Sequence, residues 1–209
     1  MIESQAVNRR DQRREAILKV ASEVFFEEGY AAASMSTIAA RVGGSKGTLY
    51  NYFKSKEELF NAHIESQCGL LFIGDEIDPT LVDDLPVAEV LTQLGERLMA
   101  HIFSAWNLNN FRLLVTEAKR TPELARIFYQ IGPAVGIERL TAYLERAKAR
   151  GAIVADDCRR AAGHFICLCR NERHLPAVLN LVEPPSAELI KVEIAETVRV
   201  FMAAYGAKA

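Results

Sequence analysis

Apolar residues recur along this chain at the spacing of a helix, and no segment shows the apolar–polar alternation that is typical of a strand. The pattern is plain in residues 10–28, where Ile17, Ala21, Val24 and Phe25 share one helical face before Gly29 ends the run. Pro133 lies inside the longest apolar pattern and should kink or split that helix. The sequence therefore predicts an all-α protein of about nine helices, over 10–28, 35–42, 45–53, 56–72, 86–104, 111–119, 121–151, 157–170 and 186–205.

Two stretches between these helices lack a clear period. The acidic segment 74–85 and the region around Pro176 are therefore predicted as loops. Starts of helices are better marked, because Ser34, Ser45 and Ser55 each precede a helical segment and can cap it. Ser55 with Glu58 forms a capping-box pattern.

The composition narrows the class of protein further. The chain has 209 residues, 50% of them hydrophobic and 25% charged, as in an ordinary globular protein. The longest run without Asp, Glu, Lys or Arg, residues 98–111, is too short to cross a bilayer as a helix. Because the N-terminus has no apolar stretch of a secretory signal, we expect a cytoplasmic protein with no membrane partner. We expect its cysteines to be reduced thiols, with any redox role left open: Cys68, Cys158, Cys167 and Cys169.

Charge is distributed unevenly along the chain. The formal net charge is −2, yet residues 1–56 hold nine Lys or Arg against six Asp or Glu. The remainder holds sixteen basic residues against twenty-one acidic ones. A basic N-terminal segment, here called the head (residues 1–56), followed by an acidic remainder indicates that the head contacts phosphate groups and that the remainder does not. Within the head, the run Arg9, Arg10, Arg13 and Arg14 is either a solvated helix face or a phosphate contact.

Residues 34–56 carry the clearest functional pattern. Two short helical segments are separated by Gly43-Gly44, and the second begins with Lys46-Gly47-Thr48 and continues to Tyr50 and Tyr52. Apolar residues of both segments can pack inward, while the polar N-terminal end of the second stays outside. This is the helix-turn-helix design, in which the second helix enters the major groove of DNA.

The run GYAAASMSTIAARVGGSKGTLYNYFKSKEELF resembles the DNA-binding domain of the tetracycline-repressor (TetR) family. The resemblance implies a three-helix DNA-binding domain over residues 1–56, with its helix-turn-helix motif at about 34–53 and a linking helix over 56–72. It implies a ligand-binding and dimerisation domain over 73–209, where FRLLVTEA and PELAR resemble the AefR-like type of C-terminal region. The DNA-binding residues that it implies are Ser34, Ser36, Ser45, Lys46, Gly47, Thr48, Tyr50, Tyr52 and Lys56.

The second domain has residues suited to a small apolar effector, although ordinary core packing accounts for each aromatic one as well. The resemblance implies a pocket somewhere between residues 86 and 170. Candidate lining residues are Phe103, Trp106, Phe111, Phe128 and Phe165, with His101, Glu117 and His164 as polar anchors. The last two helices have wide apolar faces, and the resemblance implies that they form a homodimer interface.

No pattern in the sequence indicates catalysis or a cofactor. Carboxylates are scattered, and no phosphate-binding glycine loop or nucleophile elbow is present. Cys167 and Cys169, with His164 and His174 nearby, fit no common zinc spacing, so we expect no metal. The leading hypothesis is a dimeric, ligand-responsive repressor that binds a palindromic operator. The alternative is a helical module for a small molecule or protein that no longer binds DNA.

Overall fold

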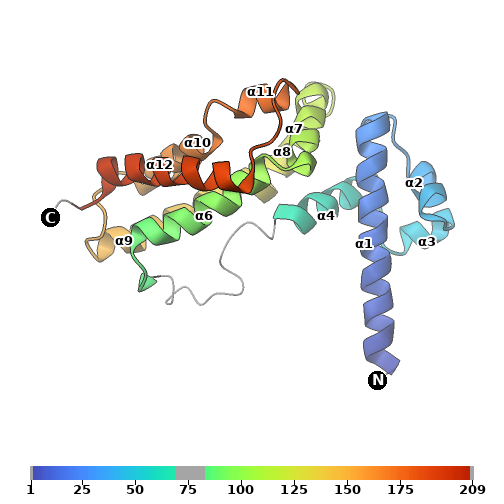
Figure 1. Ribbon diagram of the computed structural model, residues 1–209. Helices are drawn as coiled ribbons and strands as arrows, with labels where there is room; N and C mark the ends of the chain where they lie inside the picture. Colours follow the sequence, from blue (N-terminus) through green and yellow to red (C-terminus); the bar gives the residue numbers. More distant parts are fainter. Residues whose placement is uncertain (1, 69–82, 208–209) are drawn as a thin grey trace. The chain divides into compact units, whose positions relative to one another are not determined.

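The computed structural model describes the backbone of residues 2–68 and 83–207 (Figure 1). Every named element in these residues is a helix, and the one extended pairing is an isolated bridge between Ile153 and Gly206. The prediction of an all-α protein is confirmed. The described chain divides into two compact units, the first holding the residues up to Cys68 with Arg112–Ile131 and the second holding the rest.

The first unit is built around the longest helix. Its helix α1 packs against α2 and α4, and α4 also packs against α8. Phe25 of α1, Tyr30 of the following turn and Phe60 of α4 pack ring against ring, with centroids 5.4 to 5.6 Å apart. The helices of this unit are α1 (Ile2–Glu28), α2 (Met35–Val42), α3 (Lys46–Tyr50), α4 (Lys56–Cys68), α8 (Pro122–Tyr129) and the end of α7 (Ala105–Glu117).

The second unit is a bundle in which α6 packs on α12 and α10, and α10 packs on α9 (Figure 1). Gly95 of α6 allows a close approach, because a Cβ atom there would lie 2.9 Å from Ile194 Cγ2 and 3.3 Å from Phe165 Cζ. Its other elements are α6 (Val87–Ile102), α9 (Val135–Ala149), α10 (Cys158–Arg170), α11 (His174–Val178) and α12 (Ala187–Tyr205).

The start of α7 and the region around Pro176 differ from the sequence prediction. Helix α7 begins at Ala105, not at 111, because Ser104 Oγ accepts from Asn107 N and the Asn107 and Asn110 amides donate to backbone carbonyls. These bonds offset the low helix propensity of asparagine. The predicted loop around Pro176 is instead the short helix α11. Pro176 lies in its first turn, where a missing N–H removes no helical bond.

Two long helical patterns, that of α1 and the one that contains Pro133, can also be compared with the structure. Helix α1 begins at Ile2, well before the predicted start at residue 10, because residues 2–9 have no breaker although they lack an apolar stripe. The helix expected to kink or split at Pro133 is interrupted by a π-helical turn, Gln130–Ala134, between α8 and α9. This turn gives the proline ring room that a regular helix would not.

Candidate nucleic-acid interface

Two matching caps build the predicted helix-turn-helix. Ser34 Oγ accepts from the N–H of Thr37 at 3.0 Å and lies 2.9 Å from Thr37 Oγ1, at the start of α2. Ser45 Oγ repeats both distances with Thr48 at the start of α3. Between them, Gly43 has a φ of 72°, a left-handed conformation that favours glycine. The local sequence therefore fixes where each helix begins and how tightly the chain turns.

Helix α3 has one buried and one exposed side. Leu49 and, just beyond the helix, Phe53 are each 2% exposed and hold it to the rest of the unit. The opposite side exposes Lys46, Gly47, Thr48 and Tyr50. Lys46 Nζ lies 5.8 Å from the centre of the Tyr50 ring, so a cation and an aromatic hydroxyl share this face. These are the donors and the close-approach glycine that a DNA groove requires.

The other predicted contact residues vary in how free they are. Ser36 is exposed on α2, and Ser45 is exposed although its hydroxyl caps α3. Ser34 is half-buried and its hydroxyl is used as a cap, while Tyr52 is half-buried beyond α3. The structure thus brings Ser45, Lys46, Gly47, Thr48 and Tyr50 together on one short segment, with Ser36 on the preceding helix.

The structure gives Lys56 partners other than the predicted phosphate. Its ammonium donates to the carbonyl oxygens of Tyr30 at 2.6 Å and Ala33 at 2.9 Å, with a longer contact of 3.4 Å to Ala31. The same ammonium lies 4.3 Å from the centre of the Tyr30 ring. Since an ammonium has three protons, these contacts use its donors within the loop between α1 and α2.

Two arginines of α1 have contacts that the sequence did not indicate. Arg13 Nη2 donates to the carbonyl of Gly43 at 3.4 Å, and the Arg14 guanidinium lies 5.5 Å from the centre of the Phe53 ring. Both therefore touch the helix-turn-helix itself, whereas Arg10 is exposed. Only contacts between residues some 30 or 40 positions apart reveal this, so no local pattern could have found it. Arg41 pairs with Glu27 and Glu28, which raises the pKa of its guanidinium.

The predicted effector residues do not form one cluster. In the second unit, Phe103 and Phe111 pack edge-on against His174, at 6.0 and 5.3 Å, and His101 lies 5.7 Å from Trp106. His174 was not among the candidates, because its segment was predicted as a loop. Burial lowers the pKa of His101 to about 4 and also lowers that of His174.

The remaining candidates lie elsewhere. Phe165 is fully buried against Phe201 in the core of the second unit, and His164 is exposed with its Nδ1 2.5 Å from the Tyr205 hydroxyl. Glu117 and Phe128 belong to the first unit, where Glu117 is only 8% exposed and its Oε2 has no hydrogen-bond partner among the described residues. Two of the four aromatic candidates in the second unit, Phe103 and Phe165, thus belong to its buried core, whereas Trp106 and Phe111 are half-buried.

The cysteines described by the structure are unpaired thiols. Burial raises the pKa of Cys169 to about 12, Cys158 is also buried, and Cys167 is exposed on α10. Cys68 lies at the edge of the described residues, and its side chain lies outside them. Among the side chains that the structure describes, in residues 10–66 and 83–207, no group of three or more His, Cys, Asp or Glu is placed to hold a metal ion. In the same residues, no helix has the length and apolarity needed to cross a membrane.

Two family models of known proteins match this chain, one in its N-terminal part and one in its C-terminal part. Residues 17–63 match the family described as bacterial regulatory proteins, tetR family. Residues 89–207 match the AefR-like transcriptional repressor, C-terminal domain. Together these matches include α3 and the bundle of the second unit.

Individual proteins give the same answer. The Flavonoid-responsive Regulator FrrA is 34% identical, with a TM-score of 0.76, over 95% of this chain and 100% of that one. A TetR-family regulator structure from Mesorhizobium loti is 27% identical, with a TM-score of 0.78, over 94% of this chain and 98% of that one. The HTH-type transcriptional activator FasR of Mycolicibacterium smegmatis is 48% identical over 65 residues, which span 31% of this chain and 30% of FasR.

Proposed function

This chain belongs to the TetR family of bacterial transcriptional regulators, and we propose that it represses transcription as a homodimer that a small ligand releases from a palindromic operator. The observation that carries this proposal is the exposed face of α3, where Lys46, Gly47, Thr48 and Tyr50 project from a helix anchored by Leu49. Lys46 and Tyr50 suit phosphates or base edges, and Gly47 allows the backbone to approach them. Ser36 and Ser45 add hydroxyl donors beside this face.

The homodimer is proposed to form through α10 and α12, which pack together in the second unit. Val192 and Val200 of α12 are eight residues apart, so they lie on the same helical face, and they are 68% and 38% exposed. A second copy of the chain would cover such an apolar stripe symmetrically. In a dimer, the two α3 helices would reach successive major grooves about 34 to 36 Å apart.

The effector is proposed to be a small apolar molecule with an aromatic group. Support comes from the rings gathered around His174 and from the His101–Trp106 pair in the second unit. The similar protein FrrA is named as a flavonoid-responsive regulator, which fits an aromatic ligand class. A ligand can act only by binding one arrangement of the dimer more tightly than the other. The helices α4 and α7 are the proposed levers, and α7 contributes residues to both compact units.

Members of this family can repress or activate transcription, so the proposal has to choose between the two. The C-terminal region matches a repressor type, whereas FasR is named as an activator. The relation to FasR is confined to 65 residues, 30% of that protein. We therefore favour repression over activation for this chain. We also propose that it acts in the cytoplasm on double-stranded DNA and has no catalytic role.

Titration of the full chain with duplexes tests the proposal. Fragments of the DNA upstream of its own coding sequence are compared with a shuffled duplex at two salt concentrations, and sedimentation gives the mass of the complex. We expect two chains per duplex, tighter binding to one upstream fragment, and an affinity that falls as salt rises. Absent binding, or binding that ignores salt, would favour the helical module without DNA. A reporter under the bound promoter separates repression from activation.

A further inference from the structure

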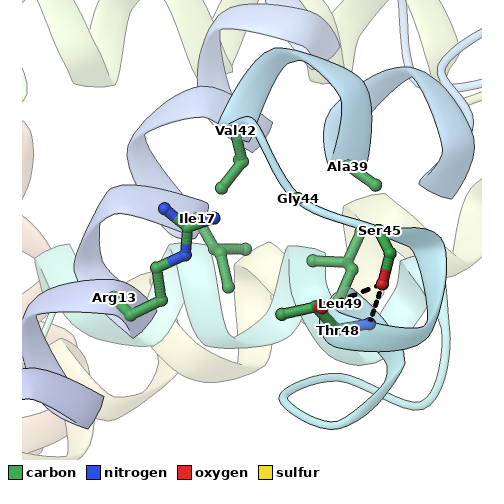
Figure 2. A pocket seen from close by; sticks show the side chains of 8 residues that line it. All are labelled: Arg13, Ile17, Ala39, Val42, Gly44, Ser45, Thr48 and Leu49. Atoms are coloured by element: carbon green, nitrogen blue, oxygen red, sulfur yellow. Dashed lines mark hydrogen bonds between the residues drawn. The ribbon is translucent and has the colours of Figure 1, made fainter.

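A hollow lies beside the turn between α2 and α3, and a side chain of α1 reaches into it (Figure 2). It is lined by Arg13 and Ile17 of α1, by Ala39 and Val42 of α2, and by Gly44, Ser45, Thr48 and Leu49. Figure 2 shows the side chains of Arg13 and Ile17 of α1 next to each other, with Ser45, Thr48 and Leu49 on the other side of the hollow. All of these residues belong to the first compact unit.

Gly44 leaves the space that Arg13 uses. A Cβ atom built on Gly44 would lie 3.1 Å from Arg13 Nη2 and 3.9 Å from Thr48 Cβ. The backbone of Gly44 is outside the left-handed region, so its conformation would accept a side chain. What opposes a larger residue at position 44 is therefore the guanidinium.

Arg13 also contacts the backbone at the end of α2. Its Nη2 donates to the Gly43 carbonyl, one of the groups that lack a partner where a helix stops. A cation at that place is favoured by the helix dipole. On the neighbouring position of α1, the Arg14 guanidinium lies over Phe53, just beyond the other end of α3. Consecutive arginines thus contact the chain before and after the recognition helix.

Helix α3 depends on such contacts more than a longer helix would. It has five residues, Leu49 is its buried one, and its remaining side chains face solvent. A helix this short is not stable by itself, so its direction is set by packing at its ends. Small changes of that direction matter, because contacts to base edges are sensitive to their geometry.

We propose that Arg13 is a positioning residue, whose guanidinium replaces a side chain at Gly44 and fixes the direction of α3 relative to α1. This rests on the proposed function in one respect, namely that α3 reads DNA. Arg13 acts on recognition through the turn and does not itself hold a phosphate. As a consequence, the effect of a larger residue at position 44 on DNA binding should have opposite signs in the presence and in the absence of the Arg13 guanidinium.

A double-mutant cycle tests this coupling. In the wild-type background, Gly44→Val should weaken operator binding, because valine and the guanidinium compete for one space. Arg13→Ala alone should weaken operator binding about 10-fold, which corresponds to the scale of one lost hydrogen bond from a charged donor. In the Arg13→Ala background, Gly44→Val should instead strengthen binding, since the valine fills the vacated hollow. Arg13→Lys should recover little, because a single ammonium lacks the planar width of the guanidinium.

Arg10→Ala is the matched control, since it removes an exposed positive charge from the same helix. Its effect should be the same whether residue 44 is glycine or valine. If Arg13 instead held a phosphate, Arg13→Ala would reduce the salt slope by about one, and Gly44→Val would rescue nothing. That result, or additive effects in the cycle, would overturn the proposal.

The same cycle read by Tm, without DNA, separates this inference from the proposed function. A wild-type chain that binds no duplex would overturn the function, while opposite signs of the Gly44→Val effect on Tm would still support the Arg13–Gly44 pair. Additive changes of Tm would overturn the pair even when the wild-type chain binds its operator.

Discussion

The ammonium of Lys56 lies 2.6 Å from the carbonyl oxygen of Tyr30 and 4.3 Å from the centre of the Tyr30 ring. Lys56 is the first residue of α4, and Tyr30 belongs to the loop that joins α1 to α2. One cation therefore ties the start of α4 to the loop that leads into the helix-turn-helix. The ring of Tyr30 is itself buried between Phe25 and Phe60.

Replacement of Lys56 should consequently act on stability. We expect Lys56→Met to lower the free energy of unfolding by about 2 kcal/mol, the scale of hydrogen bonds from a charged donor, and to lower Tm. Lys54→Met is the control, since Lys54 is exposed and its removal costs the same charge. Thermal unfolding checks the stability, and a duplex titration checks the salt slope. A salt slope that drops by about one, with Tm unchanged, would restore the phosphate contact in place of the loop.

Thr48 and Thr37 form a matched pair for testing sequence recognition. Each threonine hydroxyl lies 2.9 Å from the serine that caps its helix, but Thr48 is exposed on α3 and Thr37 is half-buried on α2. We expect Thr48→Ala to reduce discrimination between operator and shuffled duplex by about 10-fold, the lower part of the range for one specific contact. Thr37→Ala removes the equivalent hydroxyl contact from α2 and should leave discrimination intact. Equal losses of discrimination in both variants would remove Thr48 from base recognition.

Two glycines of the second unit should respond oppositely to alanine. Gly95→Ala places a methyl group 2.9 Å from Ile194 Cγ2, and we expect a loss of about 1 to 3 kcal/mol from overpacking. Among the described residues, no atom other than the neighbouring backbone of α10 lies within 4 Å of a Cβ built on Gly163, and we expect Gly163→Ala to gain about 0.5 to 1 kcal/mol. Chemical denaturation measures both changes. A variant Gly95→Ala as stable as the wild type would contradict the close approach of α6 and α12.

Burial of His101 should make stability fall in acid. The pKa of His101 is about 4 in the folded chain against an ordinary value of 6.5. At a pH between these two values, the imidazole is mostly protonated in the unfolded state and mostly neutral in the folded state. The free energy of unfolding should therefore decrease as the pH falls from about 6.5 toward 4, and lose this contribution to the slope below 4. His101→Gln should flatten that slope. The exposed His164→Gln is the control, and an unchanged slope in His101→Gln would contradict the buried neutral imidazole.

Local signals account for what the sequence could predict. Ser34 and Ser45 cap helices through bonds to residues three positions ahead, so a few neighbouring residues are enough to predict where α2 and α3 begin. The exposed face of α3 follows from the same local period, with Leu49 inside and Lys46 outside. Ser55 caps α4, although Glu58 accepts from Lys54 N rather than from Ser55 N.

Contacts between distant residues account for what the sequence could not predict. Lys56 and Arg13 were both plausible phosphate contacts by type, yet each meets a backbone carbonyl more than twenty positions away. Glu117 and Phe128 were grouped with Phe103 by composition, and the fold places them in the other compact unit. A residue's chemistry limits what it can bind, while the partner that it finds depends on the packing of separate helices.

The most direct measurement is the ratio of dissociation constants for the selected upstream duplex and a shuffled one. It is determined for the wild-type chain and for a variant in which Lys46, Thr48 and Tyr50 are alanine and the buried Leu49 is kept. We expect a wild-type ratio of at least about 10³, as for specific DNA-binding proteins, and a ratio near one in the variant at unchanged Tm. A variant that keeps the wild-type ratio would contradict the claim that the exposed face of α3 reads DNA.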